Sequence, residues 1–139
     1  MCGGQLAEDD EEFLYSCNQG DEDITLSMIL HVAGQVLDGL DDGPTPALVL
    51  ATNFGLMETL EWCWRERHDT GCLDSVSFRV QQDVVETIVQ RLELDRPAAQ
   101  ISFSCASGAA AAGIGLDWLR NGRAERVLVV AYDTLTQFC

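Results

Sequence analysis

The sequence predicts an α/β fold in which helices cover both faces of a sheet. Two continuous apolar runs, Ala47–Ala51 and Val127–Ala131, are each bounded by turn residues. Unbroken rather than alternating apolarity is typical of a strand covered on both faces, as in a parallel sheet. Between these runs lie segments whose apolar residues recur at three- and four-residue steps, which indicates connecting helices.

The chain begins with an acidic segment over residues 1–23, which we expect to be poorly ordered because it offers little to bury. Asp23 is placed to cap a helix over residues 24–40. The turn sequence Asp41-Asp42-Gly43-Pro44 ends this helix. Its apolar positions predict a single buried stripe made of Ile29, Val32, Ala33, Val36, Leu37 and Leu40.

Two further helices are expected between the first strand and the next. One follows the turn at 52–55 and carries Leu56, Leu60 and Trp64, and a loop around 70–71 comes after it. The other starts at Asp83, which together with Glu86 resembles a capping box. Its buried residues are predicted to be Val84, Val85, Ile88, Val89 and Leu92. Pro97 then breaks the chain before a strand that leads into Cys105.

Cys105 is the strongest candidate for a reactive group. It stands in Ser102-Phe103-Ser104-Cys105-Ala106-Ser107-Gly108, directly before four alanines, so we expect it at the N-terminus of a helix. Unpaired N–H groups and the helix dipole favour the thiolate there, and the thiolate is the nucleophilic form. The alternative is an inert thiol packed in the core.

The helix after Cys105 is predicted to end near Arg120, because Asn121-Gly122 is a left-handed C-cap signal. Small residues on it would let another backbone approach closely; they are Ala109, Ala112, Gly113 and Gly115. Arg120, Arg123 and Arg126 form a basic cluster at its end.

Charge and composition limit the possible functions. The net charge is −15, and residues 1–64 hold 13 acidic side chains with no Arg or Lys. Such a field repels phosphates, so we predict no nucleic acid partner. No apolar run approaches the roughly 20 residues that span a bilayer, and no signal peptide pattern is present, so we predict a cytoplasmic protein. The spacing of Cys63, His68 and Cys72 matches no common zinc site, and we predict no metal or cofactor.

The segment from Ile101 to Ala131 resembles the active-site region of β-ketoacyl synthases, the condensing enzymes of the thiolase superfamily. The resemblance rests on Ser104-Cys105-Ala106-Ser107-Gly108, the alanine-rich helix, Gly122-Arg123-Ala124-Glu125 and Val129-Val130-Ala131-Tyr132-Asp133. Leu50-Ala51-Thr52-Asn53-Phe54-Gly55 resembles an upstream strand and turn of the family. The match covers residues 24–139 and implies a thiolase-like half-domain, incomplete relative to the family, with a mixed sheet flanked by helices.

The resemblance implies acyl transfer and decarboxylative condensation in fatty acid or polyketide biosynthesis. Cys105 is the implied nucleophile, and its backbone N–H contributes to an oxyanion hole. An acyl carrier protein or acyl-CoA thioester would supply the acyl group. Phe103 and Phe54 are candidates either for the acyl pocket or for plain core. Arg120, Arg123 and Arg126 are candidates for carrier docking.

In the family, the catalytic His and Lys residues lie in the second half of the fold, and this sequence has neither residue after Cys105. We therefore expect a fragment or subunit that needs a C-terminal half, with the isolated chain inactive in condensation. The resemblance also implies that residues 100–104 pair across a dimer axis. The alternative function is a non-catalytic interaction or dimerisation protein.

Two other interpretations of the sequence are disfavoured. An α/β-hydrolase elbow needs glycine two residues before and after the nucleophile, where this chain has Phe103 and Ser107. His31 lies in a helical segment and His68 in a charged stretch, so we expect both at or near the surface rather than in catalysis.

Overall fold

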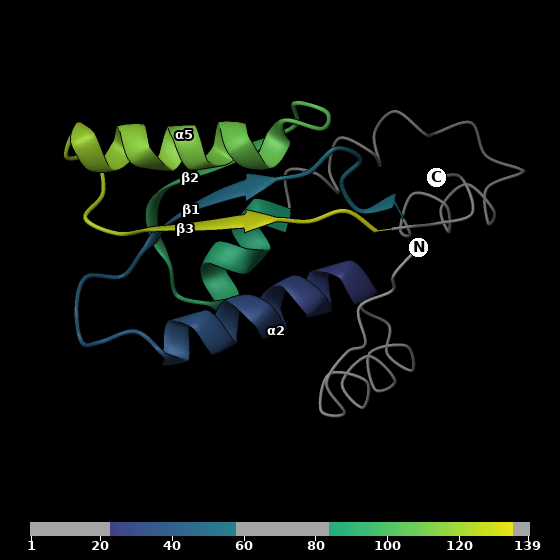
Figure 1. The fold of residues 1–139 in the computed structure, drawn as a ribbon. Helices are drawn as coiled ribbons and strands as arrows, with labels where there is room; N and C mark the ends of the chain where they lie inside the picture. Colours follow the sequence, from purple (N-terminus) through teal and green to yellow (C-terminus); the bar gives the residue numbers. More distant parts are fainter. Residues whose placement is uncertain (1–22, 58–83, 135–139) are drawn as a thin grey trace, which may run out of the picture.

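The computed structural model describes residues 23–57 and 84–134, which form a three-stranded sheet with helices on both faces (Figure 1). The predicted α/β class is therefore confirmed. In chain order the elements are α2 (Ile24–Asp38), β1 (Ala47–Ala51), a helix over 84–91, β2 (Asp95–Ile101), α5 (Ser107–Arg120) and β3 (Val127–Ala131). The expectations for residues 1–22, the helix after Leu56, the loop at 70–71 and Asp83 fall largely or wholly outside the described residues.

The sheet has the strand order β2-β1-β3, and both pairs are parallel. The expectation of a mixed sheet is thus not met by the strands that the structure describes. β1 lies in the centre, and no residue of Ala47–Ala51 is more than 1% exposed. The prediction of a strand buried on both faces is confirmed for β1. β3 is an edge in the described sheet, and Val129 is 38% exposed, so the same prediction is wrong for this strand.

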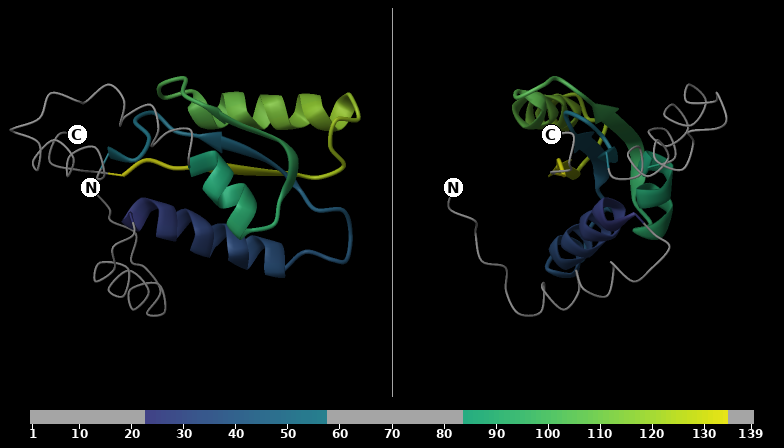
Figure 2. Two further views of the ribbon diagram at one scale, coloured as in Figure 1. Left: turned by 180° about the vertical axis from the view of Figure 1, so that it is seen from behind. Right: turned by 90° about the vertical axis from the view of Figure 1, so that its right-hand side faces the viewer.

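Each face of the sheet builds its own core, because successive side chains of a strand point to opposite faces. α5 covers one face, and α2 with the 84–91 helix covers the other (Figures 1 and 2). Ala47, Val49 and Ala51 pack with residues of α5. Leu48 and Leu50 pack with Ile29, Val84, Ile88 and Val89. β1 is therefore the shared layer on which both helical layers rest.

The cap of α2 is confirmed, but its buried stripe differs from the predicted one. Asp23 Oδ1 accepts hydrogen bonds from the N–H groups of Thr25 and Leu26, at 2.9 and 3.3 Å. The helix ends at Asp38 and buries Ile29 and Ala33. Leu26, Leu30 and Leu37 pack at the margin of the core. Three predicted core residues are instead exposed, by 44 to 54%: Val32, Val36 and Leu40.

α5 ends as predicted, in a Schellman motif. Gly122 takes φ 66°, and its N–H donates to Leu119 O at 3.3 Å, while the N–H of Arg123 donates to Trp118 O at 2.9 Å. This pattern satisfies carbonyls that a helix end leaves open. Of the four small residues, only Gly115 lies in close contact with a neighbouring strand. A Cβ added to Gly115 would lie 3.1 Å from Val127 Cγ1. The other three are exposed: Ala109, Ala112 and Gly113.

β2 ends at Ile101, so the strand does not lead directly into Cys105 as predicted. Residues 102–106 form a turn between the strand and α5. Residues 100–104 are therefore only partly a strand. Pro97 lies inside β2 rather than before it, which a strand at the edge of a sheet tolerates. The turn is what places Cys105 at the carboxyl end of the sheet.

Candidate active site

The strand order itself marks one place in the fold as a candidate site. The chain goes from the central strand β1 to β2 on one side and then returns, through α5, to β3 on the other side. In open parallel sheets, ligands bind outside the carboxyl ends of the strands where the direction of winding reverses. Here that point lies between the carboxyl ends of β1 and β3.

Polar segments from all three strands and the starts of two helices meet at this carboxyl edge. Both α2 and α5 begin at the end of the molecule where the strands finish (Figure 1). Thr25 at the start of α2 and Thr134 after β3 are joined by a hydrogen bond of 3.0 Å between their hydroxyls. The turns at 52–55 and 102–106 complete the edge.

Cys105 lies at this edge, exposed, one residue before the N-cap of α5. The prediction that it is near a helix N-terminus is confirmed, and the alternative of a buried core thiol is wrong. Ala106 provides no side-chain cap. Within residues 23–57 and 84–134, no acceptor faces the N–H groups of Cys105, Gly108 or Ala109. Open N–H groups at a helix start favour an anion.

Two site residues that sequence reasoning missed are Ser107 and Asp133. Asp133 Oδ1 accepts hydrogen bonds from Thr52 Oγ1 at 2.9 Å and from the N–H groups of Asn53 and Phe54 at 2.8 and 3.2 Å. These bonds tie the segment after β3 to the turn after β1. The available signal for Asp133 was positional, because it follows the predicted strand at 127–131, at the edge where parallel strands end. Ser107 lies within the Cys105 motif itself.

Phe103 and Phe54 come from the turns after β2 and β1 and are 68% and 46% exposed. The plain-core alternative is therefore wrong for both. Their turns are linked by Ser102 Oγ, which donates to Asn53 O at 3.1 Å. Two large apolar side chains thus stand in solvent near an exposed cysteine.

The arginine cluster lies at the far end of α5 from Cys105. A helix of 14 residues is about 21 Å long. Arg126 is structural, since its Nη1 donates to Asp41 O at 3.0 Å and its guanidinium occupies the space beside Gly43. Arg123 lies over the Trp118 ring, 5.7 Å from the centroid. Arg120 is exposed.

No histidine is placed to serve Cys105 in the described ranges. His31 lies on α2, with its Nε2 3.0 Å from Gln35 Nε2, and His68 is outside those ranges. The same residues contain no cluster of three or more His, Cys, Asp or Glu side chains that would hold a metal ion. Cys63, His68 and Cys72 are not part of the described structure.

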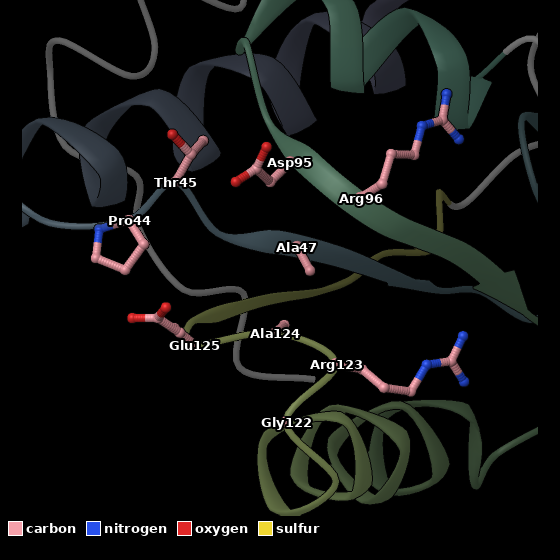
Figure 3. Close-up of a pocket in the computed structure, with 9 residues that line it drawn as sticks. All are labelled: Pro44, Thr45, Ala47, Asp95, Arg96, Gly122, Arg123, Ala124 and Glu125. Carbon is pink, nitrogen blue, oxygen red and sulfur yellow. The ribbon is translucent and has the colours of Figure 1, made fainter.

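A small cavity of about 200 Å³ lies at the opposite, amino edge of the sheet (Figure 3). Figure 3 shows the side chains of Arg96 and Arg123 extending to one side, and the carboxylates of Asp95 and Glu125 to the other. Arg96 is paired with Glu86. Opposite charges held apart, with no cysteine among the lining residues, make this cavity a weaker candidate than the carboxyl edge.

The comparisons with known proteins place the chain in no family: no family model, curated protein or solved structure matches it. No helix in the part of the chain that the structure describes is long and apolar enough to cross a membrane.

Proposed function

We propose that the chain is the cysteine-bearing half of a β-ketoacyl synthase-type acyltransferase. The observation that carries this proposal is the exposed Cys105, directly before the uncapped N-terminus of α5 at the carboxyl edge of a parallel sheet. A thiol there is open to an incoming thioester. The resemblance of residues 101–131 to the condensing enzymes supplies the reaction class.

The first step is transfer of an acyl group from a thioester. Cys105 Sγ, as the thiolate, attacks the thioester carbonyl carbon, and the carbonyl electrons move onto oxygen. The Cys105 N–H, which has no acceptor among the described residues, can donate to that oxyanion. Stabilising the oxyanion is usually the largest electrostatic contribution to catalysis of acyl transfer. Collapse of the intermediate breaks the C–S bond to the carrier, and the carrier thiolate leaves.

The second step would join two acyl units. A malonyl thioester loses CO₂, and its carbanion attacks the acyl-Cys105 carbonyl carbon. A C–C bond forms, and the Cys105 thiolate is released. In the condensing enzymes this step uses His and Lys residues of the second half, so we expect the isolated chain to accept an acyl group without condensing it. No cofactor takes part in either step.

A fatty acyl-CoA and mass spectrometry test the first step. The tryptic peptide 92–120 contains Cys105 as its only cysteine. We expect this peptide to gain the mass of one acyl group in the wild-type protein, ahead of the other five cysteines. Cys105→Ala should abolish the gain in that peptide. No acylation of Cys105 in native protein, or equal acylation of all six cysteines, would refute the proposal.

The second candidate function is a non-catalytic partner that associates through this fold. The observation in its favour is apolar surface on α5, where Leu116 and Leu119 are 45% and 44% exposed, beside the exposed Ala112 and Gly113. β2 also has an outer edge with no strand paired to it among the described residues. Exposed edges and apolar patches favour association. Sedimentation decides: a well-folded monomer that is acylated at Cys105 excludes this alternative.

A further inference from the structure

The turn that presents Cys105 is in a conformation that the local chain does not favour. Ser104 has φ 52°, in the left-handed region, which costs a residue with a side chain about 1 kcal/mol. The hydroxyl of Ser107 holds the turn. Its Oγ accepts the N–H of Phe103 at 2.7 Å and lies 2.7 Å from Ser104 O, to which it can donate.

The same hydroxyl ties this turn to the turn after β1. Ser107 is 6% exposed, and its Oγ also lies 3.1 Å from Thr52 O, so its single proton is shared between that carbonyl and Ser104 O. Ser102 Oγ makes a second link, to Asn53 O at 3.1 Å. The Cys105 turn is therefore fixed relative to residues 52–55 by two side chains that flank the cysteine.

Residues 52–55 are fixed in turn by Asp133. Its Oδ1 collects three donors from Thr52, Asn53 and Phe54, and Thr52 Oγ1 also accepts the N–H of Gly55 at 2.8 Å. Hydrogen bonds to a carboxylate are about twice as strong as neutral ones. Asp133 makes no hydrogen bond to residues 102–107 themselves.

We propose that Asp133 is a positioning residue for Cys105, acting through residues 52–55 and Ser107. This inference rests on the proposed acyl-cysteine function. By fixing the 52–55 turn, Asp133 keeps the Cys105 N–H aimed at the place where the oxyanion develops. Acyl transfer needs that donor, whereas alkylation by iodoacetamide develops no oxyanion.

Amide hydrogen exchange, read residue by residue by NMR, tests the connection without any substrate. In Asp133→Ala we expect exchange at Asn53 and Phe54 to rise by roughly tenfold or more, because their acceptor is lost. The inference requires exchange to become faster at the N–H groups of Phe103, Ala106 and Ser107 as well. Asp38→Ala, which removes an exposed acid at the end of α2, should change none of these amides.

The ratio of two Cys105 reactions tests the positioning role. Asp133→Ala should slow acylation by a fatty acyl-CoA at least about tenfold, because a misaimed N–H forfeits part of the roughly 100- to 1,000-fold effect of an oxyanion-hole donor. The iodoacetamide rate should stay within about twofold. Asp133→Asn, which keeps an acceptor oxygen in place, should recover most of the acylation rate. Ser107→Ala should resemble Asp133→Ala.

Faster exchange confined to residues 53–54, or an unchanged ratio of acylation to alkylation, would overturn the inference. If Asp133→Ala does not fold, Thr52→Val removes one of the three donors at nearly constant volume, and the same amides are compared. Failure of the wild-type protein to be acylated refutes the proposed function instead, and the exchange comparison still decides whether Asp133 holds the Cys105 turn.

Discussion

Tyr132 brings a hydroxyl into the interior next to the candidate site. Among the residues that the structure describes, this buried hydroxyl has no hydrogen-bond partner, and neither has the buried Gln100 Oε1. Burial raises the pKa of Tyr132 to about 12; nearby Thr52 opposes the shift, and the charges of Asp133 and Asp23 add to it. An unsatisfied buried hydroxyl costs about 1–3 kcal/mol.

We therefore expect Tyr132→Phe to leave stability at pH 7 unchanged or to raise it by about 1 kcal/mol. In the native protein the phenol holds its proton more tightly than in the unfolded chain, whose tyrosine pKa is about 10. The contribution of this raised pKa to the free energy of unfolding is fully present below pH 10 and is lost as the pH rises through about 12. After allowance for partial exposure this loss is about 1–2 kcal/mol.

Urea denaturation at several pH values between 7 and 12 measures both effects. The wild type should lose stability relative to Tyr132→Phe above pH 10. If the free energies of unfolding of the two proteins fall in parallel with pH, the loss of stability above pH 10 is not due to Tyr132.

The sequence predicted Cys105 near a helix start because a cysteine between a strand and an alanine-rich helix is a local pattern. It did not indicate that Asp133 and Ser107 both contact Thr52, because Thr52 is 81 residues from Asp133 and 55 from Ser107. The role of Arg126 was missed for the same reason. Its partner Asp41 lies 85 residues earlier. Periodicity carries no information on such pairs.

At the scale of the helix, α5 shows that glycines two residues apart have different functions. A Cβ on Gly113 would meet nothing within 4 Å, whereas one on Gly115 would lie 3.1 and 3.3 Å from methyl groups of Val127 and Val129. Gly115 therefore sets how closely α5 lies on β3. The exposed Gly113 only lowers helix propensity, by about 1 kcal/mol relative to alanine.

We expect Gly113→Ala to raise the free energy of unfolding by about 0.5–1 kcal/mol. Gly115→Ala should be at least about 1 kcal/mol less stable than Gly113→Ala, because the methyl group forces α5 and β3 apart. The two variants share the gain in propensity, so their difference in chemical denaturation isolates the packing cost. Equal stabilities would mean that β3 moves away from α5 with no measurable cost in free energy.

Helix boundaries and caps were predictable because the signals are local, as Asp23 and Asn121-Gly122 demonstrate. The buried face of α2 was only half predictable. Its apolar residues cover more than one stripe, and the sheet with the 84–91 helix selects the stripe through Ile29 and Ala33 over that through Val32 and Val36. That choice depends on neighbours that contribute no local signal to α2.

For the whole molecule, charge is the property most relevant to a carrier protein. The net charge of −15 repels an acidic carrier. Of the three arginines considered for docking, Arg126 is engaged with Asp41 and Arg123 with Trp118, which weakens the case for a docking patch at the end of α5.

We expect acylation of Cys105 by an acidic acyl carrier protein to accelerate as salt is raised from about 0.01 to 0.15 M, because the Debye length shrinks from about 30 to 8 Å. The rate of acylation by a small uncharged thioester should not change with salt. Both rates are measured by stopping the reactions at intervals and determining the acylated fraction of peptide 92–120 by mass spectrometry. Slower transfer at higher salt, relieved by Arg120→Ala with Arg123→Ala, would instead locate carrier docking at the end of α5.

The placement of β1 in the middle of the sheet has a consequence for how the protein is made. Both neighbours of β1 come after it in the chain, and β3 ends 80 residues beyond Ala51. At 5–20 residues per second, a ribosome needs roughly 4–16 s to add that stretch. Throughout this interval the most buried strand has at least one unpaired side, so a fragment that ends at residue 126 should bind a chaperone far more strongly than one that extends past residue 134.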